Sequence, residues 1–217
     1  CDHSPTYSTQ LLSFDPLVLY IDNFLDASEI TYLLSLGQPL FTRSMITDRK
    51  ISSGRTSDSC FLPGNNSMVA RIKQRAAHFM GGLSFDGLEA VQLVRYTTGQ
   101  KVNLHFDWHQ TRPLDRQGRS CNRLASFFIY LSADCVSGET WFPNVTVSRD
   151  LFDRDGWAEE RIRVLEEGKG IAFLPRAGSG VFWMNLRSDG TGDQRSLHAG
   201  LPVVEGTKVG MNIWVKK

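Results

Sequence analysis

Two side chains with metal-binding chemistry lie close together in the middle of the chain, His105 and Asp107. If this stretch is a β-strand, side chains two residues apart point to the same face, so the imidazole and the carboxylate would lie side by side. Ferrous iron accepts this mixed pair, and a second histidine would complete a facial triad that leaves positions for an oxo acid and dioxygen. The spacing therefore indicates an oxygen-activating iron centre, although a lone His-x-Asp triplet more often contains an ordinary hydrogen-bonded histidine.

The third ligand has to come from another histidine. His3 lies near the terminus and His78 on a predicted helix, whereas His109 would share the strand face of the first two ligands. Three ligands on one straight strand would span about 13 Å, too far to converge on one ion with bonds of about 2 Å. A distant strand must therefore supply the third ligand, and His198 is placed to do so.

Two helices are predicted in the first part of the chain, after an expected strand from Pro16 to Phe24. Asp26 and Glu29 form a capping-box pattern in front of an apolar-periodic helix that runs to about Leu36. Ser67 is the expected N-cap of the second helix, and Gly81-Gly82 its stop.

After Glu89 the chain changes to short β-branched and aromatic runs separated by turn residues. We expect an α+β, mainly β fold: a double-stranded β-helix (jelly roll) core with flanking N-terminal helices. Two stretches interrupt the strands, a loop at Gln110–Asn122 that is expected to be mobile and a charged surface insertion at Ser148–Lys169. The predicted strands are Ala90–Tyr96, Val102–Trp108, Leu124–Leu131, Gly170–Leu174, Val181–Asn185, Ser196–Leu201 and Lys208–Val215.

The bulk properties are those of one globular domain covering residues 1–217. Hydrophobic residues make up 41% and charged residues 22%, enough to bury one core. The formal charge of +1 provides no field to attract nucleic acid, so the expected partner is a small or roughly neutral molecule. No apolar run approaches the roughly 20 residues of a membrane helix. Because the chain begins at Cys1, we keep open a targeting segment or membrane anchor upstream.

Cysteines and glycosylation patterns bear on the compartment. The four cysteines, Cys1, Cys60, Cys121 and Cys135, form no CxxC pair, which argues against a zinc site. Asn65 and Asn144 each begin an N-x-S/T acceptor in a loop-like context. With an even cysteine count these acceptors favour a glycoprotein of the secretory pathway, in the endoplasmic reticulum lumen, while a cytoplasmic location stays open.

Five blocks in order give the sequence a specific resemblance. From about Leu17 to Lys217 the chain resembles the catalytic domain of the prolyl 4-hydroxylase family, particularly its fungal members. The matching blocks are Arg55-Thr56-Ser57, Arg95–Asp107, Asn122-Arg123-Leu124-Ala125, Gly138-Glu139-Thr140-Trp141-Phe142-Pro143, and His198 through Gly206-Thr207-Lys208 to Trp214.

The resemblance implies a 2-oxoglutarate-dependent dioxygenase, with O2 as oxidant and ascorbate as reductant. Lys208 would pair with the remote carboxylate of 2-oxoglutarate, because a lysine on an inward-facing strand is costly unless it meets an anion. Tyr96 and Thr140 would hold the cosubstrate through their hydroxyls. The iron ligands implied by the resemblance are His105, Asp107 and His198.

Further matches concern the substrate. The Gln110–Asn122 loop would correspond to a lid that orders over the substrate and excludes water. Each implied substrate residue also has an ordinary structural interpretation, as a turn, loop, strand-start or core residue. The implied substrate-binding residues are Arg55, Ser57, Glu89, Arg123 and Trp214.

Two departures from the family pattern fall in the substrate region. Animal and plant-type members have a tyrosine three residues before the first histidine, where its ring helps to receive the substrate proline, and this chain has Val102. Lys216 replaces a histidine two residues after the family's tryptophan. The iron and 2-oxoglutarate residues are therefore intact, while the substrate pocket differs.

The expected activity is hydroxylation of an unactivated C–H, first of all C4 of proline in a peptide or protein, with release of succinate and CO2. An oxygenase acting on a free amino acid or natural-product intermediate is the second interpretation, which Val102 and Lys216 would permit. A catalytically inactive peptide-binding module is the alternative from another class.

Overall fold

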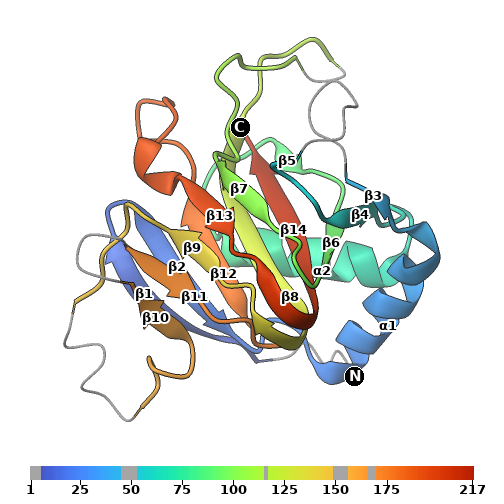
Figure 1. Ribbon diagram of the computed structural model, residues 1–217. Coiled ribbons are helices and arrows are strands. Elements are labelled where there is room, and N and C mark those ends of the chain that lie inside the picture. Colours follow the sequence, from blue (N-terminus) through green and yellow to red (C-terminus); the bar gives the residue numbers. More distant parts are fainter. Residues whose placement is uncertain (1–5, 45–52, 115–116, 149–155, 166–169) are drawn as a thin grey trace.

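Two antiparallel sheets face each other in the computed structural model, which describes residues 6–44, 53–114, 117–148, 156–165 and 170–217 (Figure 1). The larger sheet has nine strands, of which eight follow the order β1-β2-β12-β8-β14-β6-β4-β3 and β5 pairs with β14. The bounds are β1 Ser8–Phe14, β2 Leu17–Asp22, β12 Gly180–Met184, β8 Arg123–Ser137, β14 Val203–Lys216, β6 Gln92–Thr97, β4 Asp58–Phe61, β3 Thr42–Arg43 and β5 Gly87–Leu88.

The smaller sheet supplies the other face of the jelly roll. Its five strands follow the order β10-β11-β9-β13-β7. β7 is therefore an edge strand of this sheet, next to β13. The bounds are β10 Ile162–Val164, β11 Ile171–Phe173, β9 Thr140–Phe142, β13 His198–Gly200 and β7 Val102–His105.

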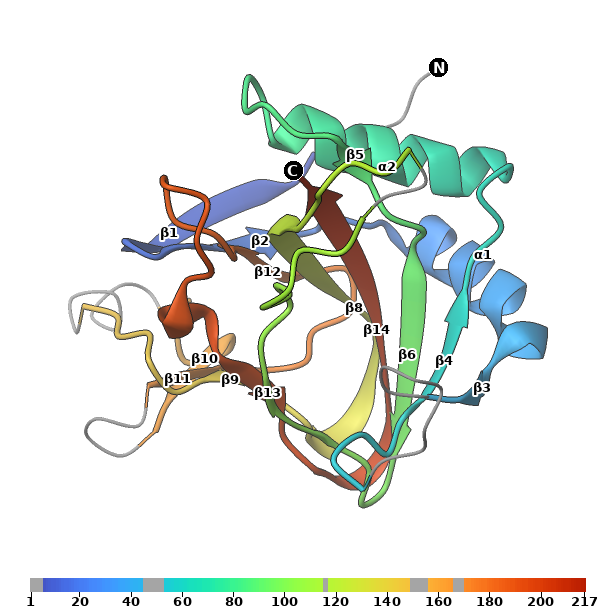
Figure 2. The same ribbon diagram turned by 90° about the horizontal axis from the view of Figure 1, so that it is seen from above.

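Two helices, α1 (Ala27–Gly37) and α2 (Ser67–Phe79), cover the outer face of the larger sheet (Figure 2). Alternation along β8 explains the layers, because successive side chains of a strand point to opposite faces. Phe127 and Ile129 belong to the apolar cluster that includes the helices, whereas Phe128 and Tyr130 belong to the cluster between the sheets. The fold class expected from the sequence is confirmed.

Side-chain hydrogen bonds to backbone N–H groups at the N-caps fix where the two helices begin. The Asp26 carboxylate accepts from the Glu29 backbone N–H at 2.8 Å and Glu29 accepts from the Asp26 N–H at 3.2 Å, so the predicted capping box is confirmed. The N-cap of α2 is Asn66, one residue before the predicted Ser67, because its Oδ1 accepts from the N–H groups of Met68 and Val69.

Strand lengths differ from the prediction where tertiary pairing extends or ends a strand. β8 and β14 are 15 and 14 residues long, well beyond the predicted segments, because they pair with each other along most of their length. β7 ends at His105 rather than Trp108, so Asp107 lies in the bend after the strand. The short strands β1, β3, β4, β5, β9 and β10 were not predicted.

The Ser148–Lys169 stretch is not simply a surface insertion. Its described part contains β10, which pairs with β11, and the buried residues Ala158 and Ile162. The ring of Trp157 packs edge-on against Tyr20, with centroids 5.4 Å apart. Residues 149–155 and 166–169 lie outside the described residues, as do His3 and Cys1.

Neither a disulfide nor a membrane-spanning helix is found among the described residues. Cys60, Cys121 and Cys135 are free thiols, and among the described residues no helix is long and apolar enough to cross a membrane.

Candidate metal centre

The two predicted histidine ligands lie opposite each other on neighbouring strands. His105 ends β7, His198 begins β13, and the two residues form a cross-strand pair. Their ring centroids are 4.3 Å apart. Each Nδ1 lies 2.9 Å from a backbone carbonyl two residues earlier in the chain, that of Asn103 and that of Ser196. A proton on each Nδ1 satisfies these carbonyls and leaves both Nε2 atoms as lone-pair donors.

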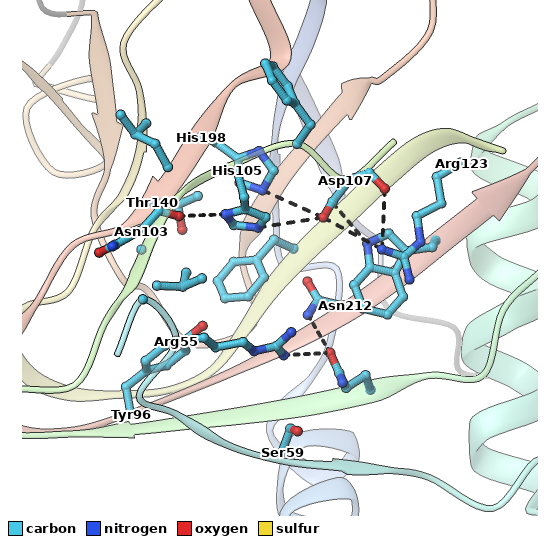
Figure 3. Close-up of a pocket in the computed structure, with 18 of the residues that line it drawn as sticks. Arg55, Ser59, Tyr96, Asn103, His105, Asp107, Arg123, Thr140, His198 and Asn212 are labelled. Carbon is cyan, nitrogen blue, oxygen red and sulfur yellow. Dashed lines mark hydrogen bonds and ion pairs between the residues drawn. The ribbon is translucent and has the colours of Figure 1, made fainter. Parts of the chain in front are cut away.

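Asp107, in the bend after β7, is the third predicted ligand. Its two carboxylate oxygens have different partners. Oδ2 accepts from the Ser126 hydroxyl at 2.6 Å and from the Trp214 indole N–H at 2.9 Å. Oδ1 faces the histidines, 3.8 Å from Nε2 of His105 and 3.9 Å from Nε2 of His198 (Figure 3). The protein therefore holds one carboxylate oxygen and presents the other.

The electrostatics favour the protonation states that a metal requires. Burial by itself raises the pKa of Asp107, but His198, Arg123 and His105, together with the Ser126 hydroxyl, bring it well below the usual range. Burial, reinforced by His105, lowers the pKa of His198 to about 4. An ionised carboxylate and neutral imidazoles are the forms that bind metal.

The geometry fits a single ion. One ligand atom from each residue of the triad can be chosen so that all lie within 4.8 Å of one another, and no other such group of three is found in the described part of the chain. Three ligand atoms about 4 Å apart surround a point roughly 2.3 Å from each, so a small closing of the side chains would give facial bonds of about 2 Å. The three side chains line a cavity of about 820 Å³, where further ligands of a bound ion would be held. His109 lines this cavity but does not belong to the ligand group, as predicted.

Lys208 lies in the same cavity and is almost fully buried. Its Nζ donates to the Gly138 carbonyl and lies 4.5 Å from the ring centroid of Tyr96. Burial lowers the pKa of Lys208 to about 8. No carboxylate of the described residues forms an ion pair with it, so the cavity holds a cation suited to an anionic ligand.

The other two residues expected to hold the cosubstrate, Tyr96 and Thr140, also line the cavity and are buried. Burial raises the pKa of Tyr96, so its phenol stays protonated as a hydrogen-bond donor. Thr140 Oγ1 is 2.7 Å from the Tyr130 hydroxyl, which fixes its side chain.

The five residues expected to bind substrate are divided between the cavity and its surroundings. Arg55, Arg123 and Trp214 line the cavity, whereas Ser57 and Glu89 do not. Ser57 is fully buried against Ser44, with 2.9 Å between the hydroxyl oxygens. Glu89 forms an ion pair with Arg123 at 2.9 Å, and this guanidinium lies 3.6 Å above the Trp214 ring. Their substrate roles stay predictions, while Trp214 has a second role as a donor to Asp107.

Several site residues could not be found from the sequence motifs. Asn185 donates to Ser126 at 2.8 Å and accepts from the Trp183 indole at 2.8 Å, extending the support of Asp107. Gln92 and Asn212 form a cross-strand pair in the cavity wall. An inward-facing amide on a strand is the one sequence signal that could have marked this pair.

Fold and site together define the class, an iron(II)- and 2-oxoglutarate-dependent oxygenase. The model of the 2OG-Fe(II) oxygenase superfamily matches residues 91–216. The chain is 32% identical over 214 residues to Probable prolyl 4-hydroxylase 3 of Arabidopsis thaliana, which covers 95% of this chain and 71% of that protein. The chain belongs to the prolyl 4-hydroxylase family of this superfamily.

Solved structures support the same fold. The viral collagen prolyl hydroxylase of Paramecium Bursaria Chlorella virus-1, in its 2OG complex, aligns with a TM-score of 0.65 and 24% identity over 92% of this chain and 95% of that one. A Pseudomonas putida prolyl-4-hydroxylase aligns with a TM-score of 0.59 and 17% identity over 97% and 92%. These relatives are plant, viral and bacterial, not fungal as the sequence resemblance led us to expect.

Proposed function

We propose that this enzyme hydroxylates C4 of proline residues within a peptide or protein. The observation that carries the proposal is an intact His105–Asp107–His198 triad at a large cavity, in a chain related to prolyl 4-hydroxylases over 95% of its length.

The mouth of the cavity supports an extended substrate. Leu40 and Phe61 line it and remain exposed, at 40% and 57% of their full accessible areas. Exposed apolar side chains beside a polar site are typical of binding surfaces, and the apolar proline ring is a suitable partner for them.

Bound iron(II) and 2-oxoglutarate supply the oxidative decarboxylation that activates dioxygen, with succinate and CO2 as products. The residues of the chain bind and orient the reactants. In this proposal the Lys208 ammonium holds the remote carboxylate of 2-oxoglutarate, and Tyr96 and Thr140 hold the same cosubstrate through their hydroxyls. Phe142 and Trp183 pack against the His198 ring, with centroids at 5.3 and 4.8 Å, and would shield this ligand from water.

The Gln110–Asn122 loop, of which residues 115–116 lie outside the described part, is proposed as a lid over the substrate. Asn122 holds its base by accepting from the His109 N–H at 2.8 Å and donating to the His109 carbonyl at 2.9 Å. Arg112 reaches the Gly190 carbonyl at 2.5 Å. These contacts anchor the loop beside the cavity, where closure would exclude water.

The test is succinate release with iron(II), ascorbate and 2-oxoglutarate, with and without a proline-containing peptide, followed by mass spectrometry of the peptide. We expect peptide-stimulated succinate and one added oxygen on proline, located at C4 by comparison with 4-hydroxyproline standards. Succinate without peptide oxidation over a panel of peptides would contradict the prolyl substrate.

A free amino acid or natural-product intermediate is the second candidate substrate. Val102 lines the cavity at the position where other members carry a substrate-binding tyrosine, so the contact surface for a proline ring is smaller. In the same assay, succinate stimulated by small acids and not by peptides would favour this candidate.

The secretory lumen remains our proposed location. Asn65 and Asn144, the two acceptor asparagines, are both exposed. A mass decrease on glycosidase treatment of protein from its native source would support this location, and unmodified asparagines would argue for a cytoplasmic one.

A further inference from the structure

The cavity wall carries more positive charge than the binding of iron and 2-oxoglutarate accounts for. Asp107 is the one carboxylate among the described lining residues, and it is a metal ligand. Of the cations, Lys208 is proposed to hold 2-oxoglutarate and Arg123 is already paired with Glu89. The lining cations are Arg43, Arg55, Arg123 and Lys208.

Arg55 is the cation with unmet hydrogen-bonding capacity. Its side chain is half-buried, and its Nε is buried with no hydrogen-bond partner. Among the described residues its side chain makes one hydrogen bond, from Nη2 to Gln92 Oε1, which is long at 3.4 Å, and none of the described carboxylates pairs with it. A half-buried guanidinium whose buried Nε has no partner and which lacks a counter-charge gains stability when an anion binds.

Arg43 does not offer the same opportunity. Its guanidinium already donates to the Thr56 backbone carbonyl. It contributes positive charge to the cavity mouth, but its donors are partly occupied. Arg43 is therefore a matched control for Arg55: the same side chain, in the same cavity, with a local acceptor.

Two amides, Gln92 and Asn212, line the cavity with Arg55 and complete a polar wall; in Figure 3, Arg55 and Asn212 lie below the triad. Gln92 on β6 and Asn212 on β14 are paired in register, and Asn212 Nδ2 donates to Gln92 Oε1 at 3.2 Å. The same Oε1 accepts from Arg55, so Gln92 positions the guanidinium. The polar wall thus presents the N–H donors of Arg55 beside two neutral amides.

We propose that the substrate carries a carboxylate near the carbon that is hydroxylated, and that the polar wall binds it through Arg55. A carboxylate matches the planar guanidinium with two parallel hydrogen bonds, which a neutral carbonyl cannot do. An Asp or Glu side chain beside the target proline and a free C-terminal carboxylate share this chemistry. The inference rests on the proposed prolyl function and narrows its substrate class.

The experiment compares matched peptides with the full chain, iron(II), ascorbate and 2-oxoglutarate. Short peptides carry one proline, with Glu or Gln at each nearby position in turn, and each has a free or an amidated C-terminus. We expect one acidic position, or the free C-terminus, to raise kcat/KM roughly tenfold to a hundredfold over its neutral partner, the range for charge-assisted hydrogen bonds. A higher kcat/KM for a Glu peptide would identify a side-chain carboxylate, and a higher kcat/KM for the free C-terminus would identify the terminal carboxylate.

Variants connect the preference to the polar wall. Arg55→Gln should bring the acidic and neutral peptides to the same kcat/KM, and Arg55→Glu should favour a Lys-bearing peptide. Arg43→Gln should leave the ratio between acidic and neutral peptides unchanged. An equal loss of the ratio in Arg43→Gln would mean that general charge, not Arg55, attracts the substrate, and would overturn the assignment.

The outcomes separate this inference from the proposed function. Peptide hydroxylation with equal kcat/KM for acidic and neutral partners would overturn the carboxylate while leaving the prolyl function intact. If no peptide is oxidised, the prolyl function fails, and the same comparison is made with small acids and their amides, with succinate as readout. Equal rates there would overturn the inference too. The wild-type comparisons need no variant to fold.

Discussion

The inner and outer parts of the cavity are built by different rules. The inner part comprises the triad, Tyr96 and Lys208; apart from the half-exposed His105 it is buried, and it is carried by strands β6, β7, β13 and β14 and the bend after β7. The outer part, comprising Arg43, Arg55, Leu40 and Phe61, is exposed or half-buried and carried by short strands and connecting segments.

This difference indicates that the inner part carries out the reaction and the outer part selects the substrate. The metal-binding side chains of the inner part already have hydrogen-bond partners that orient them. Asp107, for example, accepts two hydrogen bonds at Oδ2. In the outer part Arg55 retains unused donors. Preorganised inner groups can therefore serve one reaction, while the outer groups choose what reaches it.

The largest effect is expected from removing a ligand in the inner part. His198→Ala should abolish stoichiometric iron binding and lower succinate formation by at least about a thousandfold, because two ligands no longer define the facial site. Metal analysis and succinate release measure both. His109→Ala, which removes a neighbouring histidine outside the ligand group, should retain iron. Iron loss in His109→Ala with retention in His198→Ala would reverse the ligand assignment.

Next in size is the loss of the buried cation. Lys208→Met should weaken 2-oxoglutarate binding roughly a hundredfold, since a buried charge pair loses one partner. Calorimetric titration with 2-oxoglutarate measures this. Lys216→Met, on the same strand but outside the cavity lining, is the control and should bind normally. Unchanged affinity in Lys208→Met would remove this residue from the cosubstrate site.

The pH dependence of 2-oxoglutarate binding examines the same cation without mutation. Lys208 has a pKa of about 8, lowered by burial and held up by the neighbouring Cys135 and Glu139. The charged form exists below that pH, so affinity should be constant at low pH and fall about tenfold per unit above pH 8. Binding above pH 8 should take up a proton. A flat profile in wild type, or an equally steep one in Lys208→Met, would contradict this role.

A smaller effect should come from filling the inner part sterically. A Cβ added to Gly200 would lie 3.1 Å from Val102 Cγ1, 3.8 Å from Lys208 Nζ and 3.9 Å from the Tyr96 hydroxyl. Gly200→Ala should therefore raise the KM for 2-oxoglutarate about tenfold, with little change in stability. Gly64→Ala, where nothing lies within 4 Å of the added Cβ, is the control. Equal KM values in the two variants would show that the cosubstrate leaves this space empty.

Local sequence signals determined much of the fold. The capping box at Asp26 and Glu29 and the helical periodicity after Ser67 depend on residues three or four apart, and both helices form nearly as predicted. Short β-branched and aromatic runs between turn residues placed the central strands by equally local signals. The strands that were missed are short or lie at sheet edges, such as β1 and β10, where burial on one face leaves little pattern.

The sequence by itself also determined the metal chemistry, because His105, Asp107 and His198 are identifiable by type, spacing and resemblance. Only the tertiary structure decided how they meet. The register of β7 and β13 sets the two histidines opposite each other, and donors from β8 and β14 turn the carboxylate of Asp107 toward them. Strand register and side-chain contacts over 19 and 107 residues are set by packing of the whole core, which no local pattern encodes.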